Sequence, residues 1–158
     1  MLMAATLLSA CGFQLRGSNG AYNLPFKSIY LGFPETSPLG VELKRNLRAI
    51  DGVAVVADAA KADAVLQVVA EQRNKIILSL NSQGRVREYS LTYLFSFQVH
   101  DKKGNILLAP TEINLKRSIT FNETQVLAKE SEEVLLYRDM QTDVVQQILR
   151  RLAAIKPA

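Results

Sequence analysis

The sequence predicts an α+β fold, a two-layer sandwich in which two helices pack on one face of a mainly antiparallel or mixed four-stranded sheet. The middle of the chain holds long segments in which apolar and polar residues alternate, and this is the period of a β-strand. Helical periodicity occurs once before this region and once after it. Because no internal repeat or linker interrupts residues 26–156, we expect them to form a single domain.

The first elements expected are a short strand, a helix and a second short strand. Residues 27–32 form the first strand, and Ser37 then suits a helix N-cap, with Pro38 at the first helical position. Asp51-Gly52 ends this helix, whose apolar residues recur at helical spacing: Leu39, Leu43, Leu47 and Ile50. Residues 53–56 are a short strand or the start of one.

Three long strands follow. Over residues 64–80 the even positions are mostly apolar, and the odd positions include Gln67, Glu71, Arg73 and Lys75. Over residues 87–101 the odd positions are apolar: Tyr89, Leu91, Tyr93, Phe95, Phe97 and Val99. A turn around Gly104 leads to a return strand at 106–121, in which Pro110 marks a bulge or a sheet edge. The apolar side of this sheet must be covered.

The end of the chain supplies the cover. From Ser131 the apolar residues follow helical spacing, and they are Val134, Leu135, Tyr137, Met140, Val144, Ile148, Leu152 and Ile155. Glu132 and Glu133 lie near the positive end of this helix, and Arg150 and Arg151 lie near its negative end. We therefore expect one long C-terminal helix on the sheet.

The start of the chain predicts a lipid anchor at Cys11. A short apolar run and two small residues, Ser9 and Ala10, precede this cysteine, as in the lipobox of a lipoprotein signal peptide. We expect residues 1–10 to be the signal peptide and residues 11–25 a lipidated tether. No basic residue precedes Arg16, so either the start is assigned downstream of the true one or the sequence is a fragment. The alternative is an apolar helix start with a buried thiol.

Composition limits the functional classes. The formal net charge of +4 suits an anionic partner such as lipid phosphate or nucleic acid, although many soluble domains carry as much. His100 stands beside Asp101, but no serine motif or second cysteine offers a nucleophile, and one histidine gives no metal cluster. We expect no enzyme activity and no cofactor or metal, apart from the covalent lipid on Cys11.

Four stretches carry a resemblance to a known family. They are residues 11–17 (CGFQLRG), 87–89 (REY), 116–118 (KRS) and 127–130 (LAKE). In this order and spacing the chain resembles the LptE family of lipopolysaccharide-assembly lipoproteins. The resemblance implies an outer-membrane lipoprotein, facing the periplasm and the lumen of the LptD β-barrel, which it plugs and helps to assemble. It also implies direct binding of lipopolysaccharide during transport to the cell surface. Gly12, in place of the Asp of inner-membrane retention, agrees with this address.

Basic residues are the candidates for lipopolysaccharide binding. Arg85 and Arg87 flank Val86 at the end of a loop, where their planar guanidinium groups can bind phosphate. The resemblance implies such a role for Lys129, and the alternative for all three is a solvated surface charge. Arg117 falls on the apolar face of its strand, so we expect an ion pair with Glu130 or Glu132, with a ligand contact as the alternative.

Two other functions remain open from the sequence. A lipid-anchored scaffold of another envelope complex would have the same fold and anchor. A basic nucleic-acid-binding sandwich would stack bases on the aromatic residues at odd positions 89–97. We expect no nucleic-acid partner, because these aromatics share a face with Leu91 and Val99 and because an exported lipoprotein does not meet nucleic acid.

Overall fold

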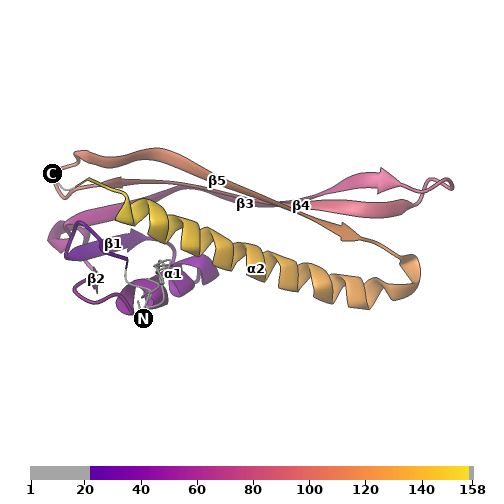
Figure 1. Cartoon of the computed structure of the whole chain (residues 1–158), viewed down its shortest axis with the longest axis horizontal. Helices are drawn as coiled ribbons and strands as arrows, with labels where there is room; N and C mark the ends of the chain where they lie inside the picture. The colour runs from indigo at the N-terminus through magenta and orange to yellow at the C-terminus, as the bar shows by residue number, and fades with distance from the viewer. Residues whose placement is uncertain (1–21, 157–158) are drawn as a thin grey trace, which may run out of the picture.

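The computed structural model describes residues 22–156, so Cys11, the signal peptide and most of the tether lie outside the described residues. The chain forms an α+β fold with two helices and a five-stranded mixed sheet in the order β2-β1-β3-β4-β5 (Figure 1). The expected count of four strands is wrong. The fifth is β2 (Ala54–Val56), which pairs in parallel with β1 (Ser28–Gly32) along the sheet edge.

The N-terminal elements form a parallel strand-helix-strand unit. Helix α1 (Pro38–Arg48) connects β1 to β2 and begins as predicted, with Ser37 Oγ accepting a hydrogen bond from Gly40 N at 3.1 Å. Gly52, with φ at 80°, lies in the turn that separates α1 from β2. β1 also pairs in parallel with the start of β3, which joins this unit to the rest of the sheet.

The three long strands lie within one or two residues of their predicted bounds. They are β3 (Ala64–Leu80), β4 (Val86–His100) and β5 (Ile106–Thr120), and they pair antiparallel in sequence order. β5 is the sheet edge, and its register against β4 shifts between Leu108 and Thr111, on either side of Pro110. Both roles expected of Pro110 are therefore confirmed.

Helix α2 (Val126–Ala153) is longer than predicted and begins five residues before Ser131, directly after the 3₁₀ turn η2 (Glu123–Gln125). The apolar pattern misses this first turn because its apolar side chains are not buried, with Leu127 80% exposed. Leu, Ala, Lys and Glu form the turn on their helical propensity instead.

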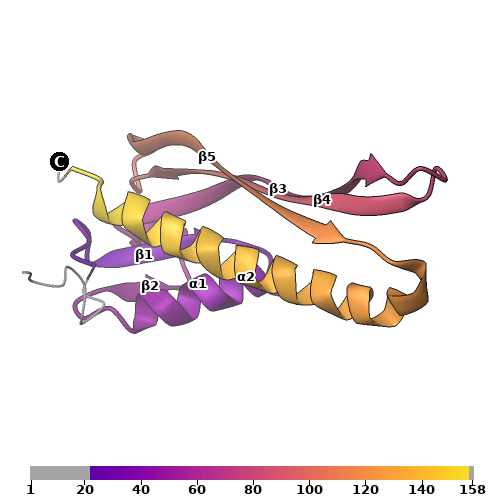
Figure 2. The same cartoon turned by 45° about the vertical axis from the view of Figure 1, so that its right-hand side comes forward.

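The molecule is elongated, and its two helices cover the sheet unequally (Figures 1 and 2). α2 runs along the length of the sheet, whereas α1 packs only at the end that holds β1 and β2. We call this end the proximal half. The distal half holds the β3–β4 turn at residues 81–85 and the connection from β5 to α2 at residues 121–125. The expectation of two helices on one face is thus met only roughly.

The hydrophobic core lies mainly under the proximal half. Tyr93, Phe95 and Phe97 of β4 are fully buried against residues of both helices, including Leu43 and Ile148. The interpretation of the aromatic residues at odd positions 89–97 as sheet core is confirmed for these three, whereas Tyr89 is half-buried and packs against the same core. Buried rings have no face free for stacking, so the structure gives no support to base binding by this row.

β3 does not keep one face along its length. Leu66 and Val68 pair with Val99 and Phe97 on the helix-covered face, but the register shifts between Val68 and Ala70. This bulge at Val69 turns the odd positions Glu71, Arg73, Lys75 and Ile77 to the helix side, opposite the inward residues of β4. The even position Ile76, opposite Ser90, therefore points to the outer face, where it is 57% exposed. The predicted covered even face holds only for the proximal half of β3.

Candidate functional site

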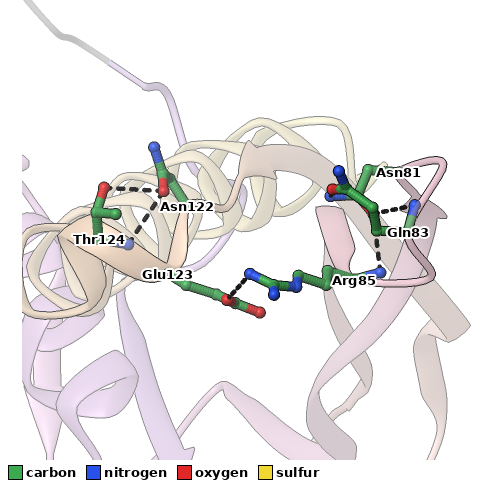
Figure 3. A network of polar contacts seen from close by, with 6 residues as sticks. All are labelled: Asn81, Gln83, Arg85, Asn122, Glu123 and Thr124. Atoms are coloured by element: carbon green, nitrogen blue, oxygen red, sulfur yellow. Dashed lines mark hydrogen bonds and ion pairs between the residues drawn. The ribbon is translucent and has the colours of Figure 1, made fainter.

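Two turns meet at the distal end of the molecule, because β4 begins where β5 ends. Phe121 N donates to Arg87 O at 2.8 Å, which fixes the β5–α2 connection beside the base of the β3–β4 turn. Arg85 then reaches from one turn to the other and pairs with Glu123 at 2.8 Å (Figure 3). Both side chains of this pair remain more than half exposed.

Side-chain hydrogen bonds shape each turn. Asn81 Oδ1 accepts from Gln83 N at 3.0 Å and from Arg85 N at 2.9 Å, and Asn122 Oδ1 accepts from Thr124 N at 3.0 Å (Figure 3). A pocket of about 260 Å³ lies between the turns, and its lining residues are Asn81, Arg85, Val86, Arg87, Phe121, Asn122, Glu123 and Thr124. Two guanidinium groups thus border one open pocket, as the sequence predicts for Arg85 and Arg87.

Lys129 lies next to this pocket on the first turns of α2. Its Nζ donates to Thr120 Oγ1 at 3.1 Å and to Glu132 Oε2 at 2.8 Å, and its side chain is 18% exposed. Thr120 is the residue before Phe121 and pairs with Glu88 across the sheet. The fold therefore gathers Arg85, Arg87 and Lys129 around one strand end. We call these three residues the distal basic cluster.

Arg117 is separate from this cluster. Its ion pair forms with Asp143 of α2 at 2.7 Å, so the expected partners Glu130 and Glu132 are wrong although an ion pair is present. Arg117 pairs across the sheet with Leu91, in the middle of β4, and a later turn of the antiparallel α2 lies at that level. The longer α2 places Glu130 and Glu132 further along, near the end of β5.

The sequence of this chain matches the model of a known protein family. The family model described as "LptE: Lipopolysaccharide-assembly" matches residues 26–152, which is most of the chain. The chain belongs to the LptE family.

Curated relatives align with nearly the whole length of this LptE-family chain. It is 27% identical over 99% of its length to "LPS-assembly lipoprotein LptE" of Yersinia enterocolitica, of which it covers 74%. It is 25% identical over 99% of its length to the protein of the same name from Photorhabdus laumondii, of which it covers 84%.

Solved structures of lipoproteins share the fold of this LptE-family chain. An NMR structure of an uncharacterized lipoprotein B from Nitrosomonas europaea matches with a TM-score of 0.77 and 41% identity, covering 90% of this chain and 91% of that one. The crystal structure of the rare lipoprotein B from Shewanella oneidensis matches with a TM-score of 0.70 and 27% identity, covering 80% and 94%.

This chain also contains a polar network that the sequence did not predict. Arg73 Nη2 donates to Tyr93 Oη at 3.1 Å and to Gln141 Oε1 at 3.0 Å, while Tyr93 Oη donates to Glu71 Oε1 at 2.6 Å. Gln141 Nε2 donates in turn to Glu42 Oε2 at 2.6 Å, which links the sheet to both helices. Burial, with the bond to Glu71, raises the pKa of Tyr93. Strict alternation does not predict this network, because the bulge at Val69 places Glu71 and Arg73 opposite the inward residues of β4.

The side chains of His100 and Asp101 each bond to other groups and not to one another among the described contacts. Asp101 Oδ1 accepts from Lys103 N and Asn105 N, and these bonds with that from the Asn105 side chain lower the pKa of the carboxyl group. His100 Nδ1 instead contacts the backbone oxygen of Asp101 at 2.8 Å. Over residues 22–156 no group of three or more His, Cys, Asp or Glu could hold a metal ion, and no helix is long and apolar enough to cross a membrane.

Proposed function

We propose that this chain is an outer-membrane lipoprotein of lipopolysaccharide assembly, anchored by lipid on Cys11. It plugs an LptD-type β-barrel, helps that barrel to assemble, and binds lipopolysaccharide on its way to the cell surface. The observation that carries the proposal is the match to the lipopolysaccharide-assembly family over residues 26–152. Its curated relatives are named LPS-assembly lipoproteins, which supports the same role here. We propose no catalytic step.

The distal basic cluster supports the ligand part of the proposal. Lipopolysaccharide carries phosphate groups, and arginine binds phosphate through paired hydrogen bonds. Arg87 takes part in none of the ion pairs between described residues, and its side chain is exposed at the pocket. Arg85 and Lys129 already hold carboxylates, Glu123 and Glu132, which a phosphate must displace. We therefore place the first contact at Arg87, with Arg85 and Lys129 as its flanks. Arg117 is the weakest candidate because it lies apart and pairs with Asp143.

Purification from membranes tests the partner part of the proposal. A tagged chain, extracted in detergent from cells that express it from its own locus, is expected to co-purify with an outer-membrane β-barrel. A Cys11→Ala variant is the matched control for the anchor, since it leaves the described fold unchanged. We expect this variant to leave the membrane fraction when the barrel is depleted, because the acyl chains supply the remaining attachment. Recovery of the chain without any barrel, or with a different envelope complex, contradicts the proposal and favours the scaffold alternative.

A further inference from the structure

The distal half of β3 has a free edge. β1 pairs with β3 only from Ala64 to Gln67, and beyond Gln67 no strand of residues 22–156 lies on that side. β4 continues to pair with the other side of β3 as far as Leu80. Alternate residues of an antiparallel strand direct N–H and C=O away from the partner, so this edge carries backbone groups that β4 cannot satisfy.

Apolar side chains flank this edge on both faces of the sheet. Ile76, Ile77, Leu78 and Leu80 are between 54% and 57% exposed, and no residue from Ile76 to Leu80 is charged. The preceding cation, Lys75, is bonded to Glu133 of α2 and lies over the ring of Tyr89 at 4.4 Å. Its charge is therefore held under the sheet and does not protect the edge.

The opposite edge of the sheet is protected. β5 carries Pro110 and the charged residues Glu112 and Lys116, and Arg151 Nη1 donates to Glu112 O at 2.9 Å. Proline, charge, side-chain capping and β-bulges are devices that keep a strand edge from pairing with another chain. On β3, Tyr137 Oη donates to Asn74 O at 2.9 Å, and over Ile76–Leu80 no such cap occurs among the described contacts. The segment Ile76–Leu80 has register shifts on either side of Ser79 but no proline, charge or cap, and this distinguishes it from the edge of β5.

We propose that the edge Ile76–Leu80 is a strand-addition site, which accepts an extended, uncharged and apolar segment of the barrel partner as a further strand. The proposal rests on the proposed function and names the surface and the contact that it uses. Another extended backbone can replace the water that bonds these free N–H and C=O groups, and apolar side chains on it would cover the exposed faces. A strand contact of this length is too small for a stable dimer, which buries about 1,200 Å² or more. The occupant therefore belongs to a partner that also contacts the chain elsewhere.

Hydrogen–deuterium exchange tests the pairing directly, because it reports backbone hydrogen bonds. The full chain is compared alone and in its purified complex with the barrel, using peptides that cover residues 75–80. We expect amide exchange in these peptides to slow by about tenfold or more in the complex, as free edge amides become bonded. Peptides from β5, whose edge is protected, serve as the internal reference.

A matched pair of variants separates edge pairing from other contacts. Ile76→Lys places a charge on the edge, and Leu127→Lys places the same charge on an exposed aliphatic position of the same distal half. Both positions are more than half exposed, so neither change removes a core contact. We expect Ile76→Lys to abolish most of the protection and to reduce barrel recovery, with Leu127→Lys behaving as the unmodified chain.

Three results would overturn the inference. A complex that forms with unchanged exchange over residues 75–80 overturns the strand addition and leaves the proposed function intact. Failure of any barrel to co-purify overturns both. Protection that appears in the isolated chain and rises with its concentration shows that a second copy of the chain, and not the barrel, occupies the edge.

Discussion

Lys129 is the most constrained cation of the distal basic cluster. Its side chain is less exposed than that of Arg85, and it bonds Thr120 on the neighbouring strand end as well as Glu132 on its own helix. A partly buried ammonium group has lost part of its hydration already, so it gives up less on binding a phosphate. This makes Lys129 a suitable ligand group although a carboxylate already holds it.

Removing the charge at Lys129 is expected to weaken lipopolysaccharide binding. We predict that Lys129→Ala lowers affinity by about three- to tenfold, the loss of one partly shielded charge-assisted contact. Lys102→Ala is the control, since Lys102 is exposed in the β4–β5 turn at the proximal end. Binding of purified lipopolysaccharide to the immobilised chain measures both variants. Equal affinity of the two variants, with unfolding midpoints unchanged, would contradict a ligand role for Lys129.

Tyr93 couples a buried hydroxyl group to two charged residues, Arg73 and Glu71. Replacing it by Phe leaves both without this partner while preserving the ring in the core. We expect Tyr93→Phe to lower the free energy of unfolding by about 1–2 kcal/mol, the usual range for a buried hydrogen-bonded group. Urea denaturation near neutral pH measures this loss.

The same residue predicts an alkaline limit to stability. Burial raises the pKa of Tyr93 above the ordinary tyrosine value of 10.0. At pH values between the two, the unfolded chain releases the phenol proton and the folded chain keeps it. Its contribution is complete below about pH 10 and is lost as the pH rises further. The pKa of Lys75, raised by its bond to Glu133, acts in the same direction. We predict that the urea midpoint falls above pH 10, and less steeply in Tyr93→Phe. Parallel pH profiles would exclude Tyr93 as a source.

At the scale of elements, α1 begins at a cap that the sequence already specifies. Ser37 Oγ accepts from Gly40 N, and Ser37 is nearly buried. Ser37→Ala is expected to lower the free energy of unfolding by about 1 kcal/mol, since one helix N–H loses its partner. Ser131→Ala is the matched control because, among residues 22–156, the one bond of Ser131 Oγ is to Leu127 O within exposed helix. Chemical denaturation of both variants decides, and an equal loss in the two would contradict the role of the cap.

The elements that the sequence predicts well are those with an uninterrupted pattern. β4 alternates from Tyr89 to Val99 and lies where expected, because every inward position from Leu91 to Val99 is buried. β3 shows the limit, since a single extra residue at Val69 reverses its faces without changing its composition. The first turn of α2 shows another, because helix propensity without burial leaves no periodic signal.

At the scale of the molecule, the proximal and distal halves differ in how far their apolar side chains are buried. Leu66 of the proximal half is fully buried, whereas Leu78 on the same strand is 54% exposed. We predict that Leu66→Ala lowers the free energy of unfolding by about 2–5 kcal/mol, and that Leu78→Ala changes it by about 0.5 kcal/mol or less. Thermal or urea unfolding of the pair measures the contrast. A comparable loss in both variants would contradict a core that lies mainly under the proximal half.

Some residues of the candidate site lie together because they are close in sequence, and others because distant elements pack together. Arg85 ends the β3–β4 turn and Arg87 lies two residues later in β4, so the sequence suffices to place them together. Their meeting with Glu123 and Lys129 depends on the pairing of β4 with β5 and on the early start of α2. The distance of Arg117 from the cluster depends on the same two features, and a linear pattern contains neither.

The bulge at Val69 amounts to a change of parity in the numbering of β3. Before it, even-numbered residues face the helices, and from Glu71 to Ile77 odd-numbered residues do. Inserting or deleting one residue between Leu66 and Ile76 would move the inward cations Arg73 and Lys75 and the outward Ile76 to opposite faces of the sheet. The length of this short interval therefore determines which face each later side chain takes, whereas a substitution changes one side chain in place.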